Sequence, residues 1–170
     1  MLNILVCVKQ VPDINLVKMD PVTGSLIRAG VPAILNPLDA NALEAAVRVK
    51  EARGGSITVI TMGPDMAKEA LRECLAAGAD RAVLLSDRAF ANADTLATSY
   101  VIVSAAKMLG DFDLIFCGKE SLDGATGQMG AQLAQRFEAA QVTGTLLIKE
   151  VNEEAKTAVV ERELEDGVDT

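Results

Sequence analysis

The stretch LNILVCV at residues 2–8 decides the fold, because it is almost wholly apolar and has the length of a strand. A run of this kind is typical of a central strand in a parallel sheet, which is buried on both faces. Three further strand-length runs follow at residues 56–62, 81–85 and 113–117, and segments of helical periodicity separate them. This alternation predicts an α/β fold, with a parallel sheet covered by helices on both faces.

The intervening segments predict four helices and some smaller elements. The first helix is expected to begin near Asp39, whose side chain is of a type that caps helices. The second is expected to carry Leu71, Cys74 and Leu75, and two more follow at residues 94–109 and from about 129 onward. The DPVTG stretch at 20–24 predicts a hairpin turn, and residues 142–151 and 157–164 predict a C-terminal strand pair.

Composition excludes several classes of function. The formal net charge of −8 and the absence of a Lys/Arg cluster argue against nucleic-acid binding. No apolar run approaches the ~20 residues of a membrane helix, and the N-terminus does not resemble a secretory signal, so we expect a cytoplasmic protein without membrane contact. There is no histidine, and the three cysteines are far apart, so we expect no metal site and no Ser-His or Cys-His catalysis. Binding is the function that remains.

Ligands of open parallel sheets bind beyond the carboxyl ends of the strands. Four segments are predicted there: residues 7–10, 36–39, 62–64 and 118–130. The last of these, GKESLDGATGQMG, carries glycines that permit close backbone approach and precedes a helix whose N-terminus favours an anion such as phosphate. An ordinary strand-to-helix turn explains the same pattern equally well. The P-loop motif and the dinucleotide-binding glycine fingerprint are both absent.

The chain resembles the beta subunit of electron transfer flavoproteins along nearly its whole length. The matching stretches include VCVKQVPD (6–13), DPVTGSLIRAGVPAILNPLDANALEAA (20–46), ITMGP (60–64), DLIFCGK (113–119), DGATGQMG (123–130) and VERELEDG (160–167). The resemblance implies a Rossmann-like sheet of the adenine nucleotide alpha-hydrolase-like group. It also implies a heterodimer with an alpha subunit that holds most of a redox-active FAD and passes electrons to and from acyl-CoA dehydrogenase-type partners.

In this family the beta subunit holds AMP, or a second FAD in the electron-bifurcating members from anaerobes, and residues 20–46 look more like the anaerobic type. Carried over by position, the resemblance implies nucleotide contacts at Cys7, Asn36, Pro37, Leu38, Asp39, Met62, Gly118, Lys119, Glu120, Ser121, Leu122, Asp123, Gly124, Ala125, Thr126, Gly127, Gln128 and Met129. Relatives usually have an acidic residue in place of Ala125 and an alanine in place of Gly127, which bears on whether AMP or FAD occupies the site.

Two other functions share the sheet architecture. A stand-alone nucleotide-binding module of the universal-stress type would show a G-x-x-G-(x)9-G-[ST] pattern, and an adenylating enzyme would show S-G-G-x-D-S after the first strand; neither pattern is present. We expect residues 1–170 to form one nucleotide-binding domain. The end at Thr170, directly after a strand, predicts a chain cut before a C-terminal partner-binding segment.

Overall fold

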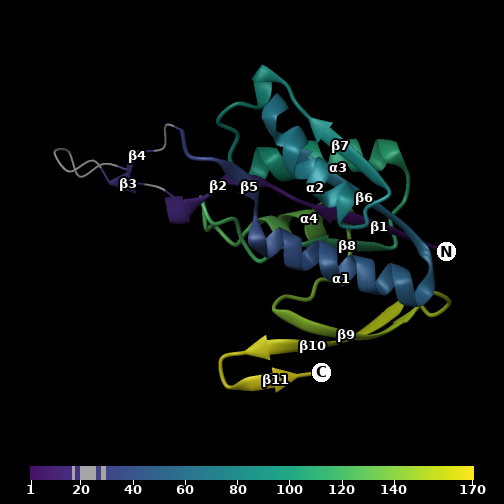
Figure 1. Cartoon of the computed structure of the whole chain (residues 1–170). Coiled ribbons are helices and arrows are strands. Elements are labelled where there is room, and N and C mark those ends of the chain that lie inside the picture. Colours follow the sequence, from purple (N-terminus) through teal and green to yellow (C-terminus); the bar gives the residue numbers. More distant parts are fainter. Residues whose placement is uncertain (17, 20–25, 28–29) are drawn as a thin grey trace.

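A four-stranded parallel sheet forms the centre of the molecule (Figure 1). The computed structural model describes residues 1–16, 18–19, 26–27 and 30–170. The strands are β1 (Leu2–Cys7), β6 (Gly55–Met62), β7 (Arg81–Leu85) and β8 (Leu114–Cys117), and their order across the sheet is β7-β6-β1-β8. The predicted parallel α/β fold is confirmed, with each strand within two residues of its expected bounds.

Helices cover both faces of this sheet. α1 (Pro37–Arg53) and α2 (Lys68–Ala76) pack on one face, and α3 (Thr95–Leu109) and α4 (Met129–Phe137) pack on the other. Alternate side chains of β1 serve the two faces: Ile4 and Val6 join the α1/α2 core, whereas Leu5 and Cys7 join the α3/α4 core. The apolar run of β1 is therefore buried on both sides, as a central parallel strand requires. Among the described residues, no helix combines the length and apolar character needed to cross a membrane.

An antiparallel sheet of three strands lies against the outer side of α1 (Figure 1). Its strands are β9 (Thr145–Asn152), β10 (Thr157–Leu164) and β11 (Gly167–Asp169), in the order β11-β10-β9. Val151 of β9 is buried in the α1/α2 core and fastens this layer to the main body. The predicted strand pair is present, but it begins three residues later than expected, and β11 was not predicted.

The segment between β1 and α1 contains short elements. β2 (Gln10–Pro12) pairs antiparallel with β5 (Ala33–Leu35), a pairing that the sequence did not predict. Between them lies a single turn of 3-10 helix, η1 (Ile14–Leu16). β3 (Lys18–Met19) pairs antiparallel with β4 (Leu26–Ile27), in agreement with the predicted hairpin, while the predicted turn at 20–24 lies outside the described residues.

The remaining connections are two further turns of 3-10 helix, η2 (Asp65–Ala67) and η3 (Arg88–Phe90). The expected second helix is present as α2, with Leu71 and Cys74 buried and Leu75 41% exposed. One detail of the expected first helix is wrong. Asp39 does not cap α1, because the helix already begins at Pro37 after Asn36.

Candidate functional site

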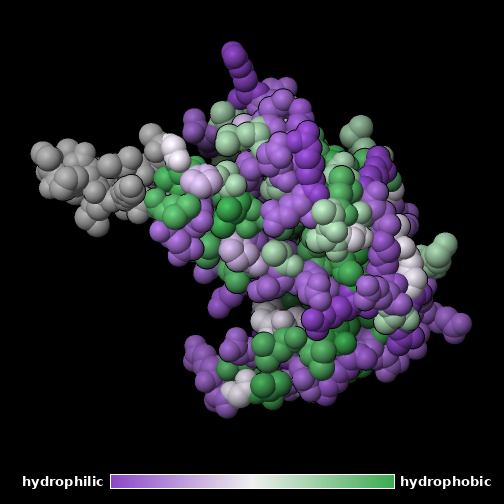
Figure 2. Space-filling model, in the orientation of Figure 1, coloured by the Kyte–Doolittle hydropathy of each residue, from purple (hydrophilic) through white to green (hydrophobic). Residues whose placement is uncertain are grey.

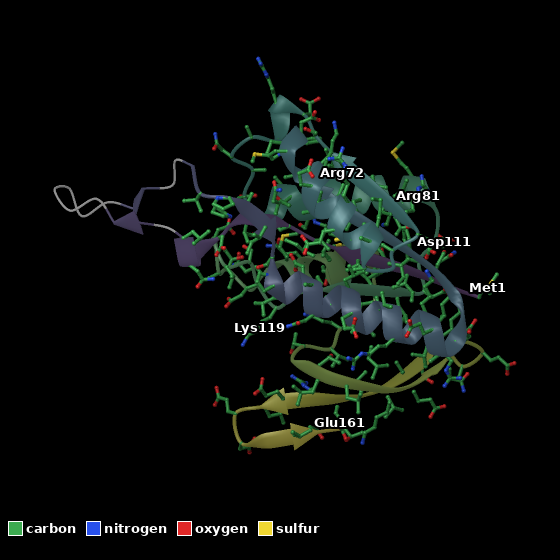
Figure 3. The ribbon with its side chains drawn as sticks, viewed as in Figure 1. Met1, Arg72, Arg81, Asp111, Lys119 and Glu161 are labelled. Carbon is green, nitrogen blue, oxygen red and sulfur yellow. The ribbon has the colours of Figure 1, made fainter. Side chains whose placement is uncertain are left out.

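The carboxyl ends of β1 and β8 mark the point where the strand order reverses. From β1 the chain moves outward through β6 and β7, and then crosses to the other side of β1 to form β8. Such a switch point is where open α/β sheets bind ligands, since the loops that follow the two strands part there. Figure 3 separates the two edges of the sheet: Lys119, just after β8, marks the carboxyl edge, and Met1 and Arg81 mark the amino edge.

Asn36 holds the loop that follows β8 in place. Its side chain is fully buried, and its Nδ2 donates to the carbonyl of Glu120 at 2.9 Å. Its Oδ1 accepts the N–H of Leu122 at 3.2 Å, and its own N–H donates to the carbonyl of Lys9 at 2.9 Å. The amide thus uses both its donor and its acceptor on the protein. Asn36 joins the start of α1 to the ends of β1 and β8.

Asp39 makes the second connection between these segments. The N–H of Lys9 donates to its Oδ2 at 2.9 Å, and the N–H of Gly118 donates to its Oδ1 at 3.0 Å. Burial raises the pKa of the Asp39 carboxyl to about 6, and hydrogen bonds from Asn36, Lys9 and Gly118 offset part of that rise. Asp39 is therefore a buried acid that ionises close to neutral pH and shapes the edge of the sheet.

Glycine is the one residue type that fits at position 118, against the first turn of α1. A Cβ at this position would lie 2.5 Å from Asp39 Oδ1 and 2.7 Å from the carbonyl carbon of Leu38. Both distances are far shorter than van der Waals contact. The glycine therefore serves the close approach of the β8 loop to the start of α1.

The rest of the loop presents backbone amides. Residues 121–125 form a turn in which the N–H groups of Gly124 and Ala125 donate to the carbonyl of Ser121. Ala125 and Gly127 have positive φ angles of 46° and 62°. For residues 126–131, at the start of α4, no acceptor for the N–H groups occurs among the described residues, and no side chain caps this helix. An uncapped helix N-terminus of this kind attracts anions.

Lys9 brings a positive charge to this loop. Its Nζ lies 2.7 Å and 2.9 Å from the two carboxylate oxygens of Asp123, and 3.4 Å from Ser121 Oγ. Burial opposes ionisation of Asp123, but the hydrogen bonds from Lys9 and Ser121 outweigh it and lower the pKa of the carboxyl. Lys9 falls in the segment 7–10 that was predicted at this edge, but it was not among the nucleotide contacts that the family resemblance implied. The signal that would have found it is its position directly after the central strand.

Cys7 and Met62 are the last residues of two sheet strands at the carboxyl edge. Cys7 ends β1 and lies in register with Ile60 of β6 and Cys117 of β8. Met62 ends β6, two residues beyond Ile60. Burial raises the pKa of the Cys7 thiol and raises that of Cys117 to about 11, so both remain protonated thiols at neutral pH. Neither thiol has the character of a nucleophile.

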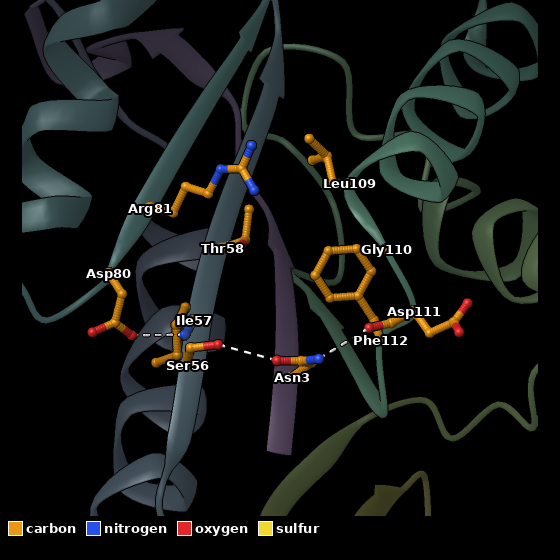
Figure 4. A pocket seen from close by; sticks show the side chains of 10 residues that line it. All are labelled: Asn3, Ser56, Ile57, Thr58, Asp80, Arg81, Leu109, Gly110, Asp111 and Phe112. Atoms are coloured by element: carbon orange, nitrogen blue, oxygen red, sulfur yellow. Dashed lines mark hydrogen bonds between the residues drawn. The ribbon is translucent and has the colours of Figure 1, made fainter. Parts of the chain in front are cut away.

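A pocket of about 240 Å³ lies at the opposite, amino edge of the sheet (Figure 4). Several of its polar groups are engaged with neighbouring strands: Ser56 Oγ donates to Asn3 Oδ1, and Asp80 accepts the N–H of Ile57. Lys50 also pairs with Asp80 at 2.6 Å. The pocket is thus lined by groups that brace the ends of neighbouring strands, and we do not place the site there.

The predicted site residues fall into three groups in the structure. Cys7 and Met62 end two strands of the sheet, residues 36–39 form the start of α1, and residues 118–129 form the loop between β8 and α4. The structure brings all three groups to one edge. The side chains of Asn36 and Asp39 are occupied by backbone groups, and Asp123 by Lys9. Lys119 extends away from the loop below the start of α1 (Figure 3). Ligand contact by these residues remains a prediction.

Fold and site together define a Rossmann-like α/β domain with an anion-attracting loop at its switch point. Sequence comparison gives the family. The family model of the electron transfer flavoprotein domain matches residues 23–170, and the chain therefore belongs to the electron transfer flavoprotein family. Its relatives within that family include beta subunits.

Over the aligned segments, about half of the residues of this chain are identical in its relatives. It is 52% identical over 166 residues to the electron transfer flavoprotein subunit beta of Thermoanaerobacterium thermosaccharolyticum, covering 98% of this chain and 62% of that protein. It is 53% identical over 167 residues to the caffeyl-CoA reductase-Etf complex subunit CarD of Acetobacterium woodii, covering 98% and 63%. It is 49% identical over 167 residues to the protein FixA of Azotobacter vinelandii, covering 96% and 59%. The chain thus spans less than two thirds of the length of these relatives.

Proposed function

We propose that this chain is the adenine-nucleotide-binding part of an electron-carrying flavoprotein. In this proposal the loop 118–129 holds the phosphate of AMP or of FAD, and the ends of β1 and β6 at Cys7 and Met62 face the adenine. The chain contributes no acid–base catalysis of its own. Electrons enter and leave through flavin, whose chemistry the cofactor supplies and the protein tunes.

The observation that carries the proposal is the shape of the 118–129 loop at the switch point. Asn36 and Asp39 fix its first residues through three hydrogen bonds, to Gly118, Glu120 and Leu122. A fourth hydrogen bond joins Asp39 to the N–H of Lys9, and all four are 3.2 Å or shorter. This rigid base leaves the N–H groups of residues 126–131 without acceptors in the described part of the chain. A preorganised set of amides binds an anion without first having to be ordered.

Exposed apolar side chains on the outer sheet support the proposal that this chain binds a protein partner. Leu146, Leu147 and Val168 on β9 and β11 are 57%, 48% and 62% exposed, and apolar side chains gather on this lower layer of the molecule in Figure 2. Exposed apolar surface of this kind marks protein interaction sites. We propose an alpha subunit as the partner in a heterodimer, with acyl-CoA dehydrogenase-type enzymes as the redox partners of the complex.

The deciding experiment is to produce the complete protein together with its alpha subunit and to identify the released ligands by mass spectrometry. One FAD and one AMP in each heterodimer would assign an ordinary carrier. Two FAD molecules would assign the second flavin to this domain and point to electron bifurcation. A complex that carries neither flavin nor adenine nucleotide would overturn the proposal.

Of these two ligands, we favour the second FAD. The support is the likeness of residues 20–46 to the anaerobic type and the 53% identity to a subunit of a caffeyl-CoA reductase-Etf complex.

A further inference from the structure

The ion pair between Lys9 and Asp123 stands where the proposed ligand would bring its negative charge. The two residues are separated by 114 positions in the sequence, and they meet because β1 and β8 are neighbouring strands. The ammonium contacts both carboxylate oxygens, at 2.7 Å and 2.9 Å. Within the described part of the chain, each is the other's only salt-bridge partner.

The backbone of Lys9 is fixed while its side chain is not. Its N–H donates to Asp39 and its carbonyl accepts from Asn36, so both polar groups of the main chain are held at the carboxyl edge. The side chain, by contrast, is 48% exposed, and within the described residues its ammonium forms hydrogen bonds only with Asp123 and Ser121. Lys9 can therefore change partner by rotating its side chain, without disturbing the strand.

Asp123 lies in the exposed part of the loop, beyond the residues that Asn36 and Asp39 hold. It precedes Gly124 and the exposed residues 125–128, and its carboxylate is bound by no group of the rigid base formed by Asn36 and Asp39. The carboxylate carries one negative charge and two oxygens. The phosphate monoester of AMP carries between one and two negative charges at neutral pH on three terminal oxygens, and the pyrophosphate of FAD carries two charges over four terminal oxygens, so either group is a stronger partner for an ammonium than the single carboxylate is.

We propose that Lys9 is a ligand-binding residue specific for the phosphate, and that Asp123 is its displaceable counter-ion. In the ligand-free protein the Asp123 carboxylate pairs with the Lys9 ammonium. A nucleotide that carries phosphate displaces the carboxylate and pairs with the ammonium, whereas a nucleoside without phosphate does not. The net charge of −8 gives this cation its importance, since the protein as a whole repels anions. This inference rests on the proposed function and names the residue pair that sets its selectivity.

The test compares AMP with adenosine, which differ only in the phosphate. Affinities are measured by calorimetry on the complete protein with its alpha subunit, after removal of bound nucleotide. Asp123→Asn should tighten AMP binding about two- to fivefold, the range expected for an ion pair this exposed, and leave adenosine unchanged. Lys9→Gln should weaken AMP about tenfold or more, as a charge-assisted hydrogen bond would. Unchanged adenosine binding shows that each variant is folded.

Lys107→Gln is the matched control, because Lys107 lies near the end of α3, next to the residues 109–112 that line the pocket at the opposite, amino edge of the sheet, and its ammonium donates to the carbonyl of Arg136. Its effect on AMP should be less than about twofold. The inference is overturned if Asp123→Asn weakens AMP binding, or if either variant at the ion pair changes AMP and adenosine by the same factor. If the unaltered protein binds neither AMP nor FAD, the proposed function falls together with this inference. AMP binding with no response to the two substitutions removes the inference alone.

Discussion

The buried carboxyl of Asp39 gives a prediction about the dependence of stability on pH. Its pKa is about 6 in the folded protein, against an ordinary value of 3.8, because burial penalises the charged form. The folded protein therefore binds this proton more tightly than the unfolded chain does. The resulting stabilisation is fully present below pH 3.8 and is lost as the pH rises to about 6.

The size of this effect follows from the two pKa values. A rise from 3.8 to about 6, at 1.36 kcal/mol for each pH unit, corresponds to about 3 kcal/mol. Asp39→Asn removes the ionisation and keeps the shape of the side chain, although its amide cannot accept both backbone N–H groups. The variant therefore loses a hydrogen bond at every pH. Its stability relative to the unaltered protein should nevertheless improve by about 3 kcal/mol between about pH 4 and about pH 7.

Urea denaturation at a series of pH values measures this difference. Far-UV circular dichroism is the suitable probe, because the chain has one tyrosine and no tryptophan. Asp80→Asn is the control: the Lys50 side chain lowers the pKa of Asp80, so the stability that this group contributes is lost only as the pH falls below 3.8. Its difference from the unaltered protein should be flat over the same window. A flat profile for Asp39→Asn, or one that slopes the other way, would refute the reasoning.

Three further predictions concern the same edge. Gly118→Ala places a Cβ 2.5 Å from Asp39 Oδ1 and should destabilise the fold by about 2 kcal/mol or more in thermal melts, whereas Gly63→Ala, whose nearest neighbour is 3.4 Å away, should be nearly neutral. Asn36→Leu leaves the N–H of Leu122 and the carbonyl of Glu120 without their partner, and should lower the free energy of unfolding by about 2 to 4 kcal/mol. Hydrogen exchange at the N–H of Leu122 should become faster, and unchanged protection there would contradict the bracing role of Asn36. The three buried or half-buried thiols should react with a disulfide reagent far more slowly in the folded protein than in urea, since burial raises the pKa of each; equal rates would contradict it.

The sheet was predictable because each central strand is a continuous apolar run bounded by turn residues. This pattern is visible in the sequence at residues 2–8, 56–62 and 113–117. Three glycines mark where helices end: Gly54, Gly78 and Gly110. The pairing of β2 with β5 was not predictable, since each has three residues and the partners lie more than twenty positions apart. β11 is short and acidic, which is the pattern of a loop.

The site was predictable in location but not in mechanism. Its position follows from topology, because the carboxyl ends of parallel strands share one edge. The roles of Asp39 and Lys9 depend on contacts between distant segments. Local sequence favoured a cap for Asp39, and for Lys9 it gave only a position directly after the central strand. An Asp two residues after an Asn-Pro pair looks the same whether it caps a helix or accepts hydrogen bonds from the ends of two strands. Nothing in a short window of sequence distinguishes the two.

The connections that shape the 118–129 loop have a consequence for biosynthesis. They join residues that are 79, 84, 86 and 114 positions apart. A nascent chain that has emerged only as far as α3 carries Asn36 and Asp39 with their later partners still inside the ribosome. The carboxylate and amide then remain hydrated, and β1 has one open edge until β8 arrives. We therefore expect the nucleotide to be captured late in synthesis, once the fourth strand has closed the sheet.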